Sequence, residues 1–67
     1  MKNYQHWSLE ALKNKRKSLI ESINQWERIL VEVKSKLIQF SLTHYIKKAK
    51  EEIHVIDAEL YYRAHIL

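Results

Sequence analysis

Apolar residues recur along the chain at alternating steps of three and four positions, in two successive series. The first series consists of Leu9, Leu12, Leu19, Ile23, Trp26, Leu30, Val33, Leu37 and Phe40, with Arg16 at its one polar position. The second series consists of Leu42, Ile46, Ala49, Ile53, Ile56, Leu60 and Leu67, with Arg63 at its polar position. This spacing lines apolar side chains along one face of a helix that packs against another helix. The pattern therefore predicts an all-α chain.

The two series are out of phase by two residues. Continuing the first frame past Phe40 would place His44, Lys47, Glu51 and His54 in the apolar seam. A coiled coil absorbs insertions of three or four residues more readily than a shift of two. We therefore expect a chain reversal within a single domain over residues 1–67: an extended arm over 1–7, a helix over 8–39, a turn over 40–43 and a helix over 44–66.

Serine residues provide the expected helix starts. Ser8 can cap the first helix and Ser41 the second, because a serine hydroxyl accepts a hydrogen bond from a free N–H of the first turn. An alternative interpretation splits the first helix near Ser18, where Ser18 and Glu21 form a capping box. That alternative gives three helices instead of two.

The composition points to oligomerisation. The chain has 67 residues and contains no Gly, Pro or Cys. Chains of this size usually need a disulfide, a metal or a second subunit to stabilise their core. Several apolar residues also lie off the seam, namely Ile20, Ile29, Val31, Ile38, Val55, Tyr61, Tyr62 and Ile66. We therefore expect a coiled-coil-type antiparallel hairpin that forms a homodimer, giving a four-helix bundle.

The net charge of +4 is distributed in bands. Residues 1–17 carry five basic residues against one acidic residue, and residues 18–33 carry one basic residue against three acidic residues. Residues 34–50 carry five basic residues and no acidic one, whereas residues 51–60 carry four acidic residues. The lysines expected to contact nucleic-acid phosphates or an acidic protein are Lys13, Lys15, Lys17, Lys47, Lys48 and Lys50.

No motif in the sequence points to catalysis. There is no glycine-rich phosphate loop and no cysteine nucleophile. Glu51 and His54 have the Glu-x-x-His spacing of di-iron bundles, but the heptad frame turns them away from the seam. We therefore expect neither an enzyme nor a bound metal or cofactor. No apolar run exceeds three residues, so we expect a soluble, cytoplasmic protein without a membrane partner.

Aromatic residues near both ends of the chain are the candidates for contact with another protein. Tyrosine and tryptophan are enriched at the energetic centres of interfaces, and the hairpin brings both chain ends to one end of the molecule. The candidates are Tyr4, Trp7, Tyr61, Tyr62 and Ile66. The sequence thus predicts a small regulatory protein that binds and modulates or inhibits a larger protein, with a nucleic-acid-binding accessory protein as the alternative. We expect Arg16 and Arg63 to extend their charged ends into solvent while their stems pack. Alternatively, they pair with carboxylates across the bundle, such as Asp57 or Glu59, and fix its register.

Overall fold

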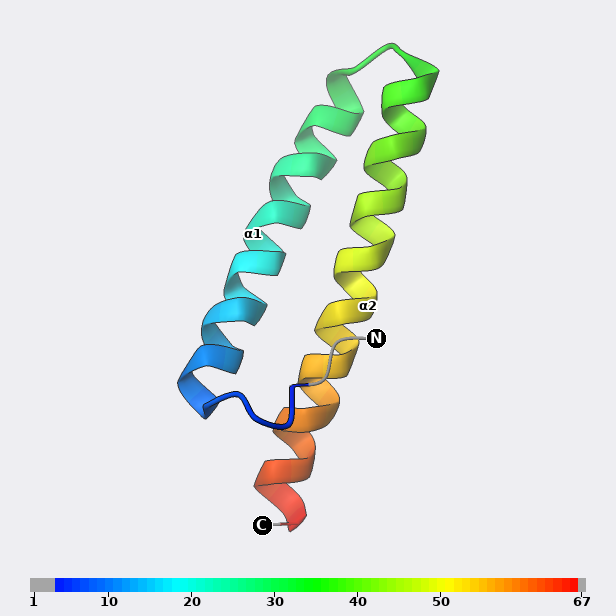
Figure 1. The fold of residues 1–67 in the computed structure, drawn as a ribbon. Coiled ribbons are helices and arrows are strands. Elements are labelled where there is room, and N and C mark those ends of the chain that lie inside the picture. Colours follow the sequence, from blue (N-terminus) through cyan, green and yellow to red (C-terminus); the bar gives the residue numbers. More distant parts are fainter. Residues whose placement is uncertain (1–3, 67) are drawn as a thin grey trace.

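Two antiparallel helices make up the computed structural model, which describes residues 4–66 (Figure 1). The first helix, α1, spans Leu9–Glu32 and the second, α2, spans Lys36–Ile66. They pack side by side in a rod of 48 × 19 × 16 Å. Residues 4–8 turn back from the start of α1 and cross to α2 at the end opposite the turn (Figure 1). The predicted all-α hairpin is confirmed.

The start of α1 follows the expected capping pattern. Ser8 is extended (φ −66°, ψ 156°), and its Oγ accepts a hydrogen bond from the Ala11 N–H at 3.1 Å. The helix then continues without a break through Ser18 to Glu32. The alternative with a helix start at Ser18 is therefore wrong, since that residue lies in the middle of a continuous helix.

The chain reverses at residues 33–35, so the turn predicted over 40–43 is wrong and those residues lie within α2. Val33 leaves the helix with φ −77° and ψ 138°, while its N–H still donates to the Ile29 carbonyl at 2.9 Å. The Oγ of Ser35 accepts from the Ile38 N–H at 3.4 Å, and the Gln39 side-chain amide donates to the Val33 carbonyl at 2.8 Å. The extended backbone suits a β-branched residue, so the reversal needs no glycine.

The error in the turn position has a physical cause. The phase shift between the two apolar series predicts a reversal after Phe40 only if Leu37 and Phe40 lie in the seam of the first helix. Leu37 and Phe40 continue the first series by spacing, but they belong to α2 and are largely exposed there. The serine that caps α2 is Ser35 and not Ser41, which lies inside the helix.

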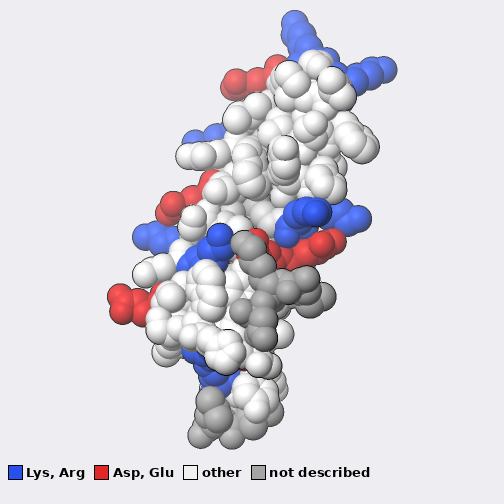
Figure 2. Space-filling model, viewed as in Figure 1, with Lys and Arg blue, Asp and Glu red and all other residues white. Residues whose placement is uncertain are grey.

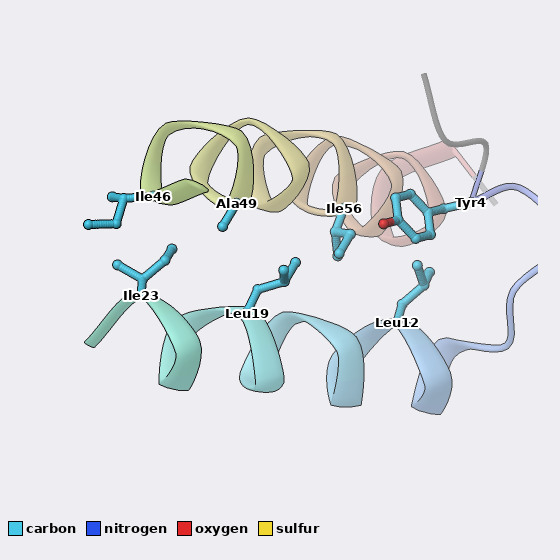
Figure 3. Packing of buried hydrophobic residues seen from close by; sticks show 7 residues of the cluster. All are labelled: Tyr4, Leu12, Leu19, Ile23, Ile46, Ala49 and Ile56. Atoms are coloured by element: carbon cyan, nitrogen blue, oxygen red, sulfur yellow. The ribbon is translucent and has the colours of Figure 1, made fainter. Parts of the chain in front are cut away.

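A single layer of apolar side chains between the helices forms the core. Its members are Leu12, Leu19 and Ile23 from α1, Ile46, Ala49 and Ile56 from α2, and Tyr4 from the arm (Figure 3). Leu12 and Ile56 are fully buried. Trp26, Leu30, Ile53, Val55 and Leu60 pack against this layer and are partly exposed. Of the described helices, neither is long and apolar enough to cross a membrane.

Candidate protein-binding surface

The arm, residues 4–8, is part of the folded structure because Tyr4 is inserted between the helices. The side chain of Tyr4 is only 2% exposed and lies beside Leu12 and Ile56 at the end of the core (Figure 3). Its hydroxyl donates a hydrogen bond to the Glu52 carboxylate. The ring of Trp7 contacts the Tyr4 ring edge to face, with centroids 4.9 Å apart. Tyr4 was expected to contact a partner, and its burial corrects that expectation.

The buried phenol of Tyr4 is held in its neutral form. Burial raises the pKa of Tyr4 well above its ordinary value, and the hydrogen bond to Glu52 and the negative charge of that carboxylate raise it further. A neutral hydroxyl donates to the carboxylate, whereas an ionised phenolate would face a like charge in a site with little water.

Arg63 fixes the arm from the other side. Its Nη2 donates to the backbone carbonyls of Tyr4, Gln5 and Trp7 at 3.2, 3.3 and 2.6 Å. The same nitrogen lies 3.7 Å from the Glu59 carboxylate, one helical turn earlier. Glu59 belongs to the same helix, so Arg63 does not make the expected pairing across the bundle, and its main contacts are with the arm. These carbonyl contacts depend on a fold-back that heptad spacing does not reveal.

The second seam arginine links the two helices. Arg16 donates through Nε to the Asp57 carboxylate at 2.6 Å, which confirms the expected pairing. Both side chains remain more than two-fifths exposed, so water screens the pair and its contribution to stability is small. The pair instead fixes the register of α1 against α2 on one side of the hairpin.

Three candidate aromatic side chains are exposed but do not form one surface. Trp7, Tyr61 and Tyr62 are each more than a third exposed. The ring of Tyr61 stacks on His65 with centroids 3.9 Å apart. Tyr61 and Tyr62 are consecutive in α2, and successive helical residues point about 100° apart, so they face different sides. The fifth candidate, Ile66, has a side chain outside the described residues.

The most exposed large apolar side chains lie around the turn. Val31 is 86%, Leu37 76% and Phe40 74% exposed. We call these three residues the tip cluster. The sequence interpretation missed it, because it placed Leu37 and Phe40 in the seam of a longer first helix. The Ser35 cap, which starts α2 before both residues, is the signal that could have revealed it.

A second apolar surface lies on the side of the hairpin that the arm crosses, which we call the arm face. Ile29, Ile38 and Tyr45 are about half exposed there, and Trp26 is partly exposed with its ring 6.0 Å from the Tyr45 ring. We call these four residues the apolar patch. The arm crosses the lower part of this face, while the centre of its upper half shows no charged side chain and charged side chains lie around its edges (Figure 2).

Heptad spacing explains why the apolar patch and the arm share one side. Glu52, which binds Tyr4, follows Tyr45 by seven residues, and Arg63 follows it by five full helical turns. These positions lie on one side of α2. The Arg16–Asp57 pair lies on the opposite side.

The six candidate lysines do not form one basic surface. Lys13 and Lys17 share a side of α1, while Lys15 lies on another side. Because the turn lies at 33–35, Lys47, Lys48 and Lys50 lie near the middle of the rod and not at its end. Basic and acidic side chains alternate along the face drawn in Figure 2.

The structure offers no metal centre within residues 4–66. It brings together no group of three His, Asp or Glu side chains in the part it describes. Glu51 and His54 are both exposed on α2. Comparison of the chain with protein-family models, curated proteins and solved structures gives no match.

Proposed function

We propose that this chain is a small non-enzymatic protein-binding module that regulates a larger protein by placing its tip in an apolar cleft of that protein. The observation that carries the proposal is the tip cluster. Its three side chains are the most exposed large apolar groups described, and they lie around one turn. A cleft that surrounds the tip would cover all three side chains, and exposed apolar surface of this kind marks interaction sites.

The shape and charge of the tip favour a particular kind of cleft. The rod is 48 Å long and less than 20 Å wide, so its end is convex and fits into a recess. Lys34 lies in the turn and Lys36 at the start of α2, both exposed beside the tip cluster. A cleft with an apolar floor and acidic residues at its rim would complement this end.

The tip proposal is tested by affinity capture with matched variants. Phe40→Glu removes a burial worth about 1.5–3 kcal/mol, so we expect recovery of the bound protein to fall at least about tenfold. Leu9→Glu is the control, because Leu9 is half exposed at the opposite end of α1. The same partner should be retained by the original chain and by Leu9→Glu, with nuclease present and at high salt.

Two outcomes would contradict the tip proposal. Equal recovery of one partner by Phe40→Glu and Leu9→Glu would place the binding surface elsewhere. Capture of nucleic acid that is lost on nuclease treatment or added salt would favour the accessory role in nucleic-acid binding.

We also propose that the hairpin forms a homodimer with the architecture of a four-helix bundle. The accessible surface of the chain is 5561 Å², whereas folded monomers of 8.2 kDa expose about 4500 Å². The excess, about 1000 Å², resembles the roughly 800 Å² that each partner buries in a stable interface. The radius of gyration is 14.3 Å, compared with about 11 Å for a compact chain of this length. A second hairpin packed alongside would cover the excess surface.

A further inference from the structure

We infer that two copies pack through their arm faces in parallel, with apolar patch against apolar patch and both tips at the same end. The inference rests on the proposed dimer and specifies the face, the orientation and the residues it uses. The patch consists of Trp26, Ile29, Ile38 and Tyr45. A second copy of the chain is the occupant that the surface area and charge layout favour.

The arm determines which part of the face is open. Tyr4 is inserted between the helices and Arg63 holds the carbonyls of the arm, so residues 4–8 cross the lower part of the arm face. Above the arm, the centre of the surface that remains shows no charged side chain, and charged side chains lie around it (Figure 2). The apolar patch lies in this upper half because Trp26, Ile29 and Ile38 are close to the turn in sequence.

Two-fold symmetry allows two ways to bring the arm faces together. In the parallel arrangement the axis runs along the rods, and each apolar patch meets the patch of the other copy. In the antiparallel arrangement each patch meets the other copy's arm, whose backbone carbonyls are already occupied by Arg63. Only the parallel arrangement places the two half-exposed patches against each other, and it also places the two arms against each other at the lower end of the dimer.

The charge bands agree with parallel packing. With the axis along the rods, α1 of one copy lies beside α2 of the other. The basic part of α1 over residues 9–17 then lies beside the acidic band over 51–60, and the acidic band over 18–33 lies beside the basic band over 34–50. A parallel pairing of α1 with α1 would instead place like charges together. The antiparallel arrangement also pairs opposite charges, so the apolar patch decides between the two.

Parallel packing has a consequence for binding. Val31 and Phe40 lie five residues from Trp26 and Tyr45 respectively, which turns them about 140° away from the patch side chains on their helices. They therefore stay exposed in the dimer. Both tip clusters point in the same direction, and the dimer offers a paired, two-fold symmetric surface to its target. Two linked contacts hold a target more tightly than one.

A spin-label distance measurement tests the arrangement on the full chain. The chain has no cysteine, so Lys34→Cys places one label in each turn without touching the patch. We expect a separation of roughly 10–25 Å, since neighbouring helix axes in a bundle lie about 10 Å apart and the two label side chains add to that distance. Adding Ile29→Glu should abolish the coupling by opening the patch. Adding Val31→Glu is the matched control and should leave it unchanged, because Val31 lies outside the patch.

Each contrary result has a distinct meaning. A separation near the 48 Å length of the rod would overturn the parallel arrangement and keep the dimer. Loss of coupling in the Lys34→Cys chain, with helical circular dichroism intact, would overturn the dimer as well. Retention of coupling with Ile29→Glu would exclude the patch as the interface. None of these results changes the outcome expected for Phe40→Glu in the capture experiment. Failure of the parallel dimer can therefore be distinguished from failure of the tip proposal.

Discussion

Replacing Ile56 with alanine is expected to unfold a large part of the population. Ile56 is fully buried against the α1 side of the core, and truncation of such a side chain costs about 2–5 kcal/mol. The free energy of unfolding of a chain of this size is about 3–10 kcal/mol. The substitution therefore removes much or all of the free energy of unfolding. We expect a large drop in the midpoint of urea unfolding, measured by circular dichroism.

The matched control for Ile56→Ala is Val31→Ala. Val31 is also β-branched and helical, but it is the most exposed large apolar side chain described, so we expect a change within about 0.5 kcal/mol. Equal shifts in the urea midpoint for the two variants would mean that Ile56 does not lie in the core as the structure has it.

Replacing Tyr4 with alanine is expected to have the second large effect, although the residue lies outside both helices. Loss of its buried ring should cost about 3–5 kcal/mol, as for other large aromatic side chains in cores. It should also free the arm that Arg63 holds through three carbonyls. Tyr61→Ala is the control, since Tyr61 is mostly exposed and its ring contacts only His65 among the described aromatic pairs. A similar free energy of unfolding for both variants would contradict a docked arm.

The contribution of the Tyr4 hydroxyl to stability can be measured from the pH dependence of the free energy of unfolding. Because the pKa of Tyr4 is raised above its ordinary value of 10.0 in the folded chain, unfolding releases a proton at alkaline pH. The neutral Tyr4 hydroxyl therefore contributes fully to the free energy of unfolding below pH 10. This contribution is lost as the pH rises from 10 toward the pKa of Tyr4 in the folded chain. We expect the free energy of unfolding of Tyr4→Phe to fall less steeply above pH 10 than that of the original chain. An equally steep fall in both chains would exclude a raised pKa of Tyr4 as a cause.

Some of the structure follows from local spacing in the sequence. Ser8 precedes an uninterrupted apolar series, so its capping role could be predicted. Arg16 is the polar residue of the first seam, so its pairing with a carboxylate of the other helix could be predicted as well, whereas the choice of Asp57 depends on the turn at 33–35. In both cases the deciding information lies within a few residues or within one helical frame.

Other features depend on contacts that sequence spacing does not specify. Apolar spacing places the turn after Phe40, whereas the observed turn at 33–35 is held by the Ser35 cap and the Gln39 side chain. Tyr4 pairs with Glu52, 48 residues away, and no periodic pattern predicts such a contact. The positions of the turn and the arm then determine which apolar side chains stay exposed. For that reason the largest exposed apolar side chains lie in the tip cluster and the apolar patch, and not only among the aromatic residues near the chain ends.

The central claim is that the apolar surface exposed by a single hairpin binds protein, and that its first partner is a second copy of the chain. Sedimentation equilibrium of the unmodified chain tests this claim most directly. The chain has a mass of 8.2 kDa. We predict a mass of about 16 kDa at micromolar concentrations, as expected of a dimer that covers about 1000 Å² on each copy. A mass of 8.2 kDa up to the highest concentration, with the helices intact, would contradict it.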